Sequence, residues 1–430
     1  MSTLQKTKVL IEGKTKKIWG TDDLGCVIVE SKDDLTAGDG AKHDILLGKG
    51  AWSTTTTCNV FSLLTKCGIP IAFQEELDAT HFVAKKCDMV PLEVVVRREA
   101  HGSYLKRNPH LPKGHLFPRL ICEFYLKTSG RKWGDLGLPC DDPMIIFSED
   151  SAELFVPSKP IWQQIPFIKP CLSKFLTALG LNESDLSLMQ ESALRTFLAL
   201  EKAWQILNQR LVDFKVEFGV YNGEFLLSDV IDSDSWRKIE DGAYSDKQVY
   251  RDGGPMAEVA KKFREAAELT ARFKIPRQQV ILWLGSDKDD KAVFLNDFAR
   301  LGDNASVKIK LITCSAHKEP ITAYHALHEA VQEVPDSVVI AYIGRSNGAG
   351  PMLSANCTVP LITVPASIKE FPEDIWSSLR APSNVPIMTV LDPKNATLAA
   401  MQILSARNPA LYTNLRFEQE KRLSNIVLLS

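Results

Sequence analysis

The sequence has no long hydrophobic run and no cysteines at metal-binding spacing. None of its apolar segments reaches the roughly 20 residues that a membrane-spanning helix needs. The nine cysteines are scattered and never spaced as CxxC, which argues against a disulfide framework or a zinc site and favours a reducing compartment. The N-terminus has no apolar core or small-residue cleavage site, so we expect no signal peptide, no membrane partner and a cytosolic location.

A strong excess of charge is also absent. The formal net charge is −2 and the isoelectric point is near 6.5, which argues against a nucleic-acid-binding surface across the whole chain. Apolar residues make up 45% of the sequence and charged residues 24%, as in ordinary globular proteins. A length of 430 residues predicts two or three domains, each large enough for its own core.

What is present centres on residues 212–218, where apolar and charged side chains alternate strictly. This alternation predicts a half-buried strand with Asp213, Lys215 and Glu217 on one face. Carboxylates beside a lysine are typical of a magnesium–nucleotide site. The alternative is a solvated sheet face with a Lys–Glu pair.

Asn222-Gly223 follows and predicts a hairpin whose returning strand carries Asp229. A two-residue turn would pair Glu217 with Ser228 and send Asp229 to the apolar face. A longer loop or a bulge would bring Asp229 to the charged face. Because burying an aspartate among apolar side chains is costly, we expect the bulge or the longer loop.

Two basic stretches accompany this hairpin. Residues 8–30 predict paired strands around Gly13, Lys14 and Lys16, without the GxxxxGK[ST] pattern of a Walker loop. They indicate either a flap over phosphates or an exposed basic hairpin. Arg97 and Ser103 follow a strong β pattern, where they suit a phosphate or carboxylate or form a charged turn.

Helices are predicted over residues 49–66, 182–209 and 255–273, and the best domain boundary lies at 274–279. After it, short apolar strands alternate with helices, which predicts a parallel, doubly wound sheet. The expected strands are residues 280–285, 307–312, 338–343, 361–365 and 387–390.

The first three of these strands each end in a polar loop, two of which bear glycine, at the sheet edge where such folds bind ligands. Ser286 and nearby backbone amides suit a phosphate, and Asp289 could hold ribose hydroxyls. His317 titrates naturally near neutrality and suits proton transfer, although a lone loop histidine is more often structural. The loops are GSDKDD (285–290), TCSAHKEP (313–320) and GRSNGAGP (344–351).

These motifs carry a family resemblance. Residues 1 to about 262 resemble SAICAR synthetase, through EGKTK, TAGDGA, KKCDMVPLEVVVRREAHGS, VDFKVEFG and LSDVIDSDSWR. Residues from about 277 resemble aminoimidazole ribotide (AIR) carboxylase, through GSDKD, SAHK and GRSNGAGP. The fusion resembles the bifunctional animal enzymes of purine synthesis. It implies a two-lobed α+β ligase domain (1–262), a linker (263–276) and a flavodoxin-like doubly wound α/β domain (277–430).

The resemblance implies that the second domain carboxylates AIR with carbon dioxide to CAIR, without biotin, metal or ATP. The first domain would then join CAIR to L-aspartate, with ATP and Mg²⁺, through an acyl phosphate. In the second domain the implied residues are Ser286 and Asp289 for phosphate and ribose, His317 for the ring proton with Lys318 beside it, and Ser346 and Gly348 for carbon dioxide.

In the first domain, the residues that the resemblance implies fall into three groups. They are Gly13, Lys14, Lys16 and Met89 for ATP; Glu217 and Asp229 for Mg²⁺; and Lys215, Arg97, Ser103, Arg237 and Arg251 for substrate anions or transition-state charge.

Two positions depart from the family pattern. Lys288 stands where many relatives have a small hydroxyl residue, and SAHK continues as EPIT where relatives commonly have an aspartate after the proline. Two alternatives stay open: a C-terminal mutase acting on a carbamate-bearing ribotide, and a nucleotide-binding scaffold without turnover. The resemblance also implies an octameric core, for which the apolar helical region 396–412 offers surface.

Overall fold

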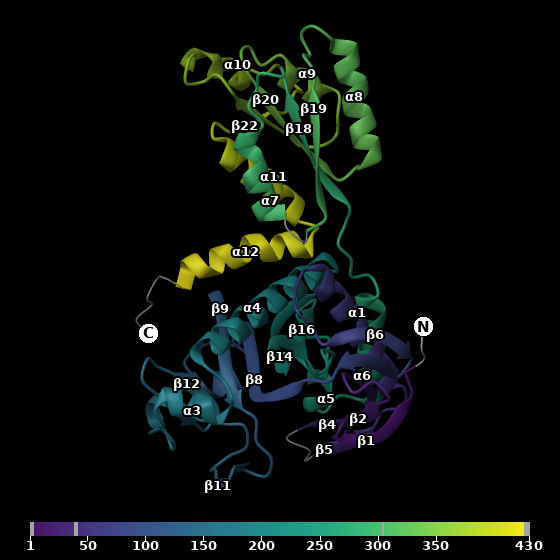
Figure 1. The fold of residues 1–430 in the computed structure, drawn as a ribbon, viewed down its shortest axis with the longest axis vertical. Coiled ribbons are helices and arrows are strands. Elements are labelled where there is room, and N and C mark those ends of the chain that lie inside the picture. Colours follow the sequence, from purple (N-terminus) through teal and green to yellow (C-terminus); the bar gives the residue numbers. More distant parts are fainter. Residues whose placement is uncertain (1–3, 38–41, 303–304, 425–430) are drawn as a thin grey trace. The chain divides into compact units, whose positions relative to one another are not determined.

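The computed structural model describes residues 4–37, 42–302 and 305–424. Residues 38–41 of the TAGDGA motif, including Asp39, lie outside the described residues. Two compact units are present: the described residues up to Phe273 together with those from Phe417 onward, and Lys274–Arg416 (Figure 1). Within the described ranges, no helix is both long and apolar enough to cross a membrane.

The first unit contains a five-stranded antiparallel sheet in the order β1-β2-β3-β7-β6. Helix α1 packs on this sheet and occupies Lys49–Lys66, as predicted. The strands are β1 (Lys6–Glu12), β2 (Lys16–Thr21), β3 (Cys26–Ser31), β6 (Phe73–Asp78) and β7 (His81–Lys85), and a separate pair is formed by β4 (Asp34–Ala37) and β5 (Lys42–Ile45).

An eight-stranded sheet completes the first unit, in the order β13-β12-β9-β8-β14-β16-β17, with β15 paired to β14. Its strands are β8 (Asp88–Glu99), β9 (Leu116–Leu126), β12 (Met144–Phe147), β13 (Ala152–Phe155), β14 (Arg210–Tyr221), β15 (Glu224–Ser228), β16 (Trp236–Glu240) and β17 (Ala243–Tyr244). A separate two-stranded pair is formed by β10 (Lys132–Trp133) and β11 (Leu136–Gly137).

Helix α4 (Glu183–Ile206) packs on strands β8, β9 and β14 of this sheet. Buried side chains recur along it at helical spacing, from Met189 through Ala193 and Phe197 to Trp204. Its N-terminus is a capping box in which Asn182 and Asp185 satisfy backbone N–H groups, which confirms the predicted helix. The unit's other helices are α2 (Ser103–Arg107), η1 (Ile161–Gln163), α3 (Leu172–Ala178), α5 (Gln248–Arg251) and α6 (Met256–Thr270).

The hairpin between β14 and β15 corrects the prediction of a bulge or longer loop. Asn222 and Gly223 form a two-residue turn with φ of 52° and 81°, and Glu217 pairs with Ser228. Asp229 avoids the apolar face by another route, because β15 ends at Ser228 and Asp229 adopts a left-handed φ of 67°. The alternation that would have buried it therefore stops one residue earlier.

Strand β14 is also more buried than its alternating pattern predicts. Asp213 on the charged face is 3% exposed and Glu217 is 5% exposed. Both carboxylates are paired: Arg97 on the neighbouring strand β8 pairs with Asp213, and Lys127, which follows β9, pairs with Glu217.

The second unit is a five-stranded parallel sheet in the order β19-β18-β20-β21-β22, which confirms the doubly wound prediction. In chain order this is 2-1-3-4-5, the flavodoxin-like arrangement. The strands are β18 (Gln278–Leu284), β19 (Val307–Thr313), β20 (Ser337–Ile343), β21 (Leu361–Pro365) and a short β22 (Met388–Thr389).

Helices cover both faces of this parallel sheet. On one face α8 and α9 bury Ala323, Leu327 and Leu353 against β18 and β20, and α7 packs with α11 over β20 on the other. The helices are α7 (Ala292–Gly302), α8 (Pro320–Glu333), α9 (Ala349–Ala355), η2 (Pro372–Asp374), α10 (Ile375–Leu379), α11 (Pro393–Ser405) and α12 (Pro409–Ser424), the last of which continues into the first unit's residues.

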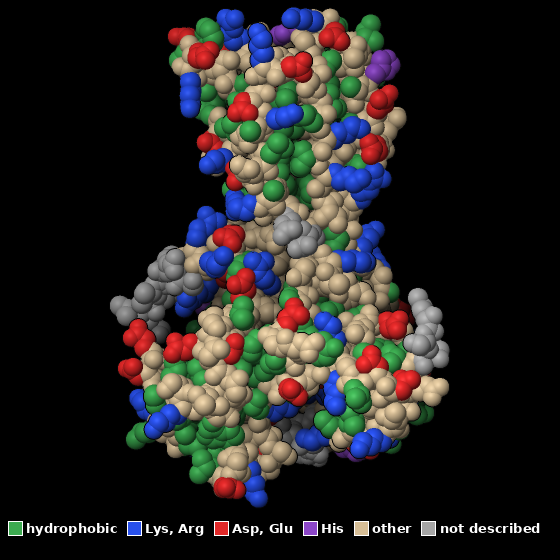
Figure 2. All heavy atoms as spheres, in the orientation of Figure 1, with side chains coloured by type: hydrophobic (Ala, Val, Ile, Leu, Met, Phe, Trp, Pro, Cys, Tyr) green, Lys and Arg blue, Asp and Glu red, His purple; other side chains and the backbone are tan. Residues whose placement is uncertain are grey.

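Two features of the composition can be followed in the structure. All nine cysteines are free thiols. On the face shown in Figure 2, acidic and basic side chains are interspersed on each unit, in keeping with a net charge near zero.

Candidate active sites

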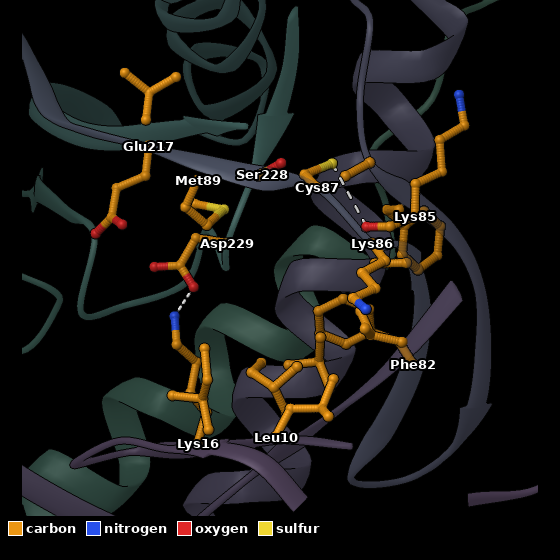
Figure 3. Close-up of a pocket in the computed structure, with 18 of the residues that line it drawn as sticks. Leu10, Lys16, Phe82, Lys85, Lys86, Cys87, Met89, Glu217, Ser228 and Asp229 are labelled. Carbon is orange, nitrogen blue, oxygen red and sulfur yellow. Dashed lines mark hydrogen bonds and ion pairs between the residues drawn. The ribbon is translucent and has the colours of Figure 1, made fainter. Parts of the chain in front are cut away.

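A cavity of about 500 Å³ lies between the two sheets of the first unit (Figure 3). We call it the first-unit cavity. Most of its wall is apolar, and Met89 on β8 contributes to it. Residue 219, beside the cavity, must be glycine, because a Cβ added there would lie 2.5 Å from Cys87 Cβ and 3.2 Å from Met89 Sδ. The apolar wall is formed by Leu10, Ile11, Ile18, Val27, Val29, Ala72, Phe73, Phe82, Ala84, Val90 and Pro91.

One end of the first-unit cavity is polar and carries Lys16, Lys127, Glu217 and Asp229. Lys16 forms an ion pair with Asp229, and Lys127 forms one with Glu217. The structure thus brings together Glu217 and Asp229, as the resemblance implies. An apolar cavity that ends in paired lysines and carboxylates suits a ligand with an aromatic body and a phosphate tail.

Electrostatics at this end keep Glu217 ionised. Burial acts to raise the pKa of Glu217, but the ammonium groups of Lys215, Lys127 and Lys16 more than offset it, so that pKa lies below its usual range. Burial lowers the pKa of Lys16 to about 8, although Glu217 opposes the change. An anionic oxygen ligand and a readily neutralised lysine therefore share one end of the cavity.

Lys215 lies beside this cluster on β14. Its ammonium is 2.8 Å from Glu93 Oε2 and 3.6 Å from Glu217 Oε1. Burial acts to lower the pKa of Lys215, but the two carboxylates more than offset it and raise that pKa. Lys215 is therefore a fixed positive charge between two acids.

Glu93 and Lys127 were missed by the sequence analysis. Glu93 lies on β8 directly opposite Glu217, and burial raises its pKa although Lys215 opposes the change. Its only sequence signal is an acid that stands between the apolar residues Leu92 and Val94 of β8. Lys127 follows β9 in a stretch that the sequence left without clear periodicity, so neither residue could be placed before the strand pairing was known.

Gly13 and Lys14 lie in the turn between β1 and β2, where Gly13 N–H donates to Lys16 O over 2.9 Å. The predicted strand–turn–strand is thus present. Lys16 reaches the first-unit cavity, whereas Gly13 and Lys14 are not among the described residues that line it.

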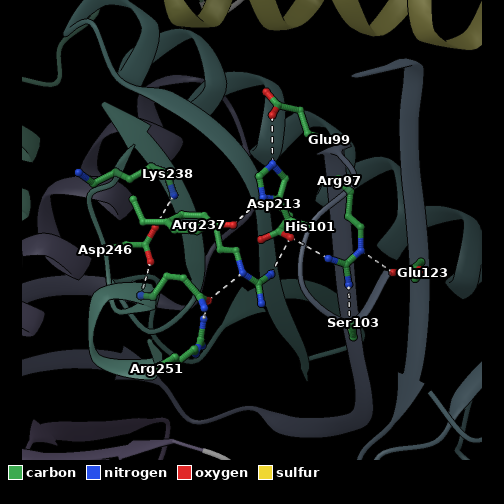
Figure 4. Close-up of polar contacts among 12 residues, drawn as sticks. Arg97, Glu99, His101, Ser103, Glu123, Asp213, Arg237, Lys238, Asp246 and Arg251 are labelled. Atoms are coloured by element: carbon green, nitrogen blue, oxygen red, sulfur yellow. Dashed lines mark hydrogen bonds and ion pairs between the residues drawn. The ribbon is translucent and has the colours of Figure 1, made fainter. Parts of the chain in front are cut away.

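A second group of polar residues surrounds Asp213 (Figure 4). Asp213 Oδ2 accepts from Arg97 Nη1 and from Arg237 Nη1, each over 2.7 Å. Arg97 also donates to Glu123 over 2.7 Å and to Ser103 Oγ over 3.4 Å. Arg97 is 3% exposed and faces two carboxylates, which compensate its positive charge. Its hydrogen bonds hold Ser103 and Asp213 in place.

Arg237 and Arg251 converge on one amide oxygen. Arg237 Nε lies 3.2 Å and Arg251 Nη1 3.3 Å from Gln248 Oε1. Burial lowers the pKa of Arg251, and the positive charge of Arg237 adds to the effect. Gly102, with φ of 55°, lets the backbone approach, since a Cβ there would lie 2.5 Å from Arg237 Nη2. Two neighbouring guanidinium groups with an adjacent backbone turn suit a phosphate or carboxylate.

In the second unit, the loops after β18, β19 and β20 meet at the carboxyl edge of the sheet. Asp289 Oδ2 accepts the backbone N–H of Ser286 over 2.9 Å, and a Cβ on Gly344 would lie 3.7 Å from Asp289 Oδ1. The ring of His317 lies against Gly348, where a Cβ would be 2.5 Å from Cδ2 of that ring. We call this convergence the carboxyl-edge site.

The carboxyl-edge site combines an acid and an accessible imidazole. Burial raises the pKa of Asp289, which the N–H groups of Ser286 and Gly285 oppose. His317 and Lys318 are exposed. Ser346 has a left-handed φ of 54°, which presents its backbone at the loop tip. No cluster of three or more His, Cys, Asp or Glu side chains able to hold a metal occurs within residues 4–37, 42–302 and 305–424.

Fold and sites together define an enzyme with two separate sites, one in an antiparallel α+β unit and one at the edge of a doubly wound parallel sheet. Comparison with known proteins identifies the family. A family model described as SAICAR synthetase matches residues 9–145 and 171–268, and one described as AIR carboxylase matches residues 279–424.

Relatives match nearly the whole chain. "Probable multifunctional protein ADE2" of Caenorhabditis elegans is 35% identical over 436 residues, which cover 98% of this chain and 96% of that protein. "Bifunctional phosphoribosylaminoimidazole carboxylase/phosphoribosylaminoimidazole succinocarboxamide synthetase" of Drosophila melanogaster is 34% identical over 438 residues, covering 98% and 94%. The chain belongs to this family of bifunctional AIR carboxylase/SAICAR synthetase proteins.

A solved structure supports the fold of the first unit. The phosphoribosylaminoimidazole-succinocarboxamide synthase of Ehrlichia chaffeensis is 26% identical, with a TM-score of 0.51, and the match covers 62% of this chain and all of that one.

Proposed function

We propose that this protein catalyses two consecutive steps of purine biosynthesis. The second unit carboxylates AIR with carbon dioxide to CAIR, and the first unit ligates CAIR to L-aspartate with ATP to give SAICAR, ADP and phosphate. The observation that carries the proposal is the presence of both sites on one chain, in a family whose members are named for this pair of activities.

For carboxylation, the enamine-like ring carbon of AIR attacks carbon dioxide, a carbon–carbon bond forms and the ring proton leaves. His317 is exposed at the carboxyl-edge site and takes that proton, with Lys318 next to it. The Ser286–Asp289 loop holds the ribotide phosphate and ribose, and the Ser346–Gly348 loop holds carbon dioxide against the imidazole. This step needs no biotin, ATP or other cofactor.

For ligation, the CAIR carboxylate first needs a leaving group, because a carboxylate is a poor electrophile. ATP transfers its terminal phosphoryl group to that carboxylate, and the aspartate amine then displaces phosphate from the acyl phosphate. Lys215 lies where it can stabilise charge on the transferred group. Arg237 and Arg251, with Ser103 fixed by Arg97, hold the substrate anions.

The first-unit cavity fits ATP with its adenine against Met89 and its phosphates towards Lys16, with the Gly13–Lys14 turn as a flap. Glu217 and Asp229 would hold Mg²⁺. The fit rests on two carboxylates that line the same end of the cavity and pair with lysines there. When bound, the metal would neutralise phosphate charge and orient the transferred group.

We also propose a cytosolic homo-octamer with domains at 1–262 and 277–430 and a linker at 263–276, into which helix α6 extends as far as Thr270. Free thiols support a reducing compartment. Apolar side chains exposed on the second unit support its self-association, among them Val293, Leu295, Leu311, Ile321, Tyr324, Trp376 and Leu379. The region 396–412, which was expected to offer this surface, has its large apolar side chains buried or half-buried instead.

An omission experiment tests both activities. Full-length protein is incubated with AIR, bicarbonate, L-aspartate, ATP and Mg²⁺, and the products are followed by mass spectrometry while one component at a time is left out. We expect CAIR without ATP, and SAICAR only with ATP, L-aspartate and Mg²⁺. Dependence on a carbamate-bearing ribotide in place of carbon dioxide would show a mutase, and nucleotide binding without any product would show a scaffold.

A further inference from the structure

The loop that follows β20 is held in place by a segment that the sequence motifs do not include. This loop, Gly344–Gly348, carries Ser346 in a left-handed conformation with φ of 54°. A non-glycine residue adopts that conformation only at an energetic cost, so neighbouring groups must hold it. Four contacts from the segment Phe371–Ser378 do so.

The central contact is made by Asp374, whose Oδ1 accepts the backbone N–H of Ser346 over 2.9 Å. Ser377 Oγ accepts the backbone N–H of Asn347 over 2.9 Å, and it donates to the backbone carbonyl of Asp374 over 2.7 Å. Asp374 and Ser377 therefore hold two successive peptide N–H groups of the loop.

Two further contacts flank this pair. The buried Asn347 amide donates to Ser378 Oγ over 3.1 Å, while its Oδ1 accepts the N–H of Gly350 over 2.8 Å. The Arg345 guanidinium lies 4.5 Å from the centre of the Phe371 ring. The loop is thus held on one side along most of its length.

On its other side the same loop contacts the imidazole. Gly348 N–H donates to Ser346 O over 2.6 Å, and Gly348 lies directly against the His317 ring. A displacement of Ser346 would therefore move Gly348, and with it the surface on which the imidazole rests. The contacts form a continuous path from Asp374 through Ser346 and Gly348 to His317.

We propose that Asp374 is a positioning residue for carboxylation, which sets the Ser346–Gly348 backbone opposite His317. The inference rests on the proposed function of the carboxyl-edge site. The role assigned to Asp374 is exerted through the loop, because its Oδ1 accepts the Ser346 N–H. Its contact is at Ser346, on the His317 side of the loop, and not at Gly344, beside which Asp289 lies.

The test compares Asp374→Ala with Asp374→Asn and, as a matched control, Glu373→Ala at the exposed neighbouring acid. CAIR formation is measured at varied dissolved carbon dioxide and varied AIR, and SAICAR formation from supplied CAIR is measured on the same preparations. We expect Asp374→Ala to lower kcat/KM for carbon dioxide about ten-fold or more, because small misplacements of reacting groups cost this much. The KM for AIR should change less than about two-fold.

Asp374→Asn keeps an oxygen that can accept the Ser346 N–H, so we expect it to retain most of the activity, as should Glu373→Ala. Equal carbon dioxide kinetics in Asp374→Ala and wild type would overturn the inference while leaving the proposed function intact. Wild-type protein that forms no CAIR would instead overturn the proposed function.

If Asp374→Ala also loses SAICAR formation, the variant has a general folding defect, and Ser377→Ala then tests the inference in its place. It removes the acceptor for Asn347 N–H and leaves the Asp374 carboxylate in place. A decrease confined to the carbon dioxide kinetics supports the inference, and unchanged kinetics contradict it.

Discussion

Replacement of Gly348 by alanine is expected to displace the His317 imidazole without changing the stability of the fold. Gly348 precedes α9 with φ of −74° and ψ of −27°, a conformation that alanine adopts freely. The backbone therefore tolerates the change. The new Cβ, however, would lie 2.5 Å from Cδ2 and 2.7 Å from Cε1 of His317, where ordinary contacts are 3.4 Å or longer.

The imidazole must withdraw by more than the 0.9 Å that separates 2.5 Å at Cδ2 from 3.4 Å, because His317 Nε2 lies closer still to the new Cβ. Because His317 is an exposed side chain, it can move without unfolding the loop. A displacement of about 1 Å at a reacting group can cost roughly 100-fold in rate, equivalent to about 2.7 kcal/mol of activation free energy. We expect a loss of this size in CAIR formation.

The assay is CAIR formation at saturating AIR and carbon dioxide, with thermal unfolding and SAICAR formation from supplied CAIR as companion measurements. Gly302→Ala is the matched control, since its Cβ would meet only Met401 Cε at an ordinary 3.6 Å. Carboxylation in Gly348→Ala within about two-fold of wild type would refute the assigned role of the His317 position, because the required ring movement exceeds what a positioned base tolerates.

The remaining predictions concern both units. Lys215→Ala should abolish SAICAR formation and spare carboxylation, and His317→Asn should do the reverse; loss of both activities in either variant would contradict separate sites. Burial lowers the pKa of Lys238 from 10.5 to about 8, so the folded protein binds fewer protons than the unfolded chain between these values. The free energy of unfolding should therefore rise by about 3 kcal/mol from pH 8 to 10.5, at about 1.4 kcal/mol per pH unit, and Lys238→Met should remove that rise in urea titrations. Asn182→Ala should cost about 1 kcal/mol of unfolding free energy by removing the α4 cap, while both activities persist at 25 °C.

Elements with local signals could be predicted from the sequence. The helix predicted at 49–66 matches α1 at both ends, and the helix predicted at 182–209 contains α4, which occupies Glu183–Ile206. The parallel sheet followed from short apolar strands alternating with helices, a pattern that few other folds produce. Strict alternation placed Lys215 and Glu217 on one strand, and the alternation of short strands with helices placed His317 in the loop after the second strand of the parallel sheet.

Features that depend on pairing between distant segments could not be predicted. Glu93 meets Glu217 only because β8 and β14 pair in one register, and Lys127 enters the cavity only because β9 lies beside β8. Asp374 likewise acts on a loop that precedes it in the chain, through a backbone N–H that no side-chain pattern reveals. The alternation of apolar and polar positions also led to the wrong prediction of a bulge or longer loop in the hairpin, because that prediction treated Asp229 as part of the returning strand.

The two-residue turn at Asn222 and Gly223 limits which length changes this hairpin can accept. Exposed loops generally tolerate insertions, since lengthening a flexible loop costs little free energy. Here β14 is held in register by β8 and β16, so one added residue would shift β15 alone. Asp229 would then leave Lys16, and Ser228 would no longer lie opposite Glu217. Loop length at this exposed turn is therefore expected to be as restricted as the identity of a substrate-binding side chain, although neither turn residue lines the cavity.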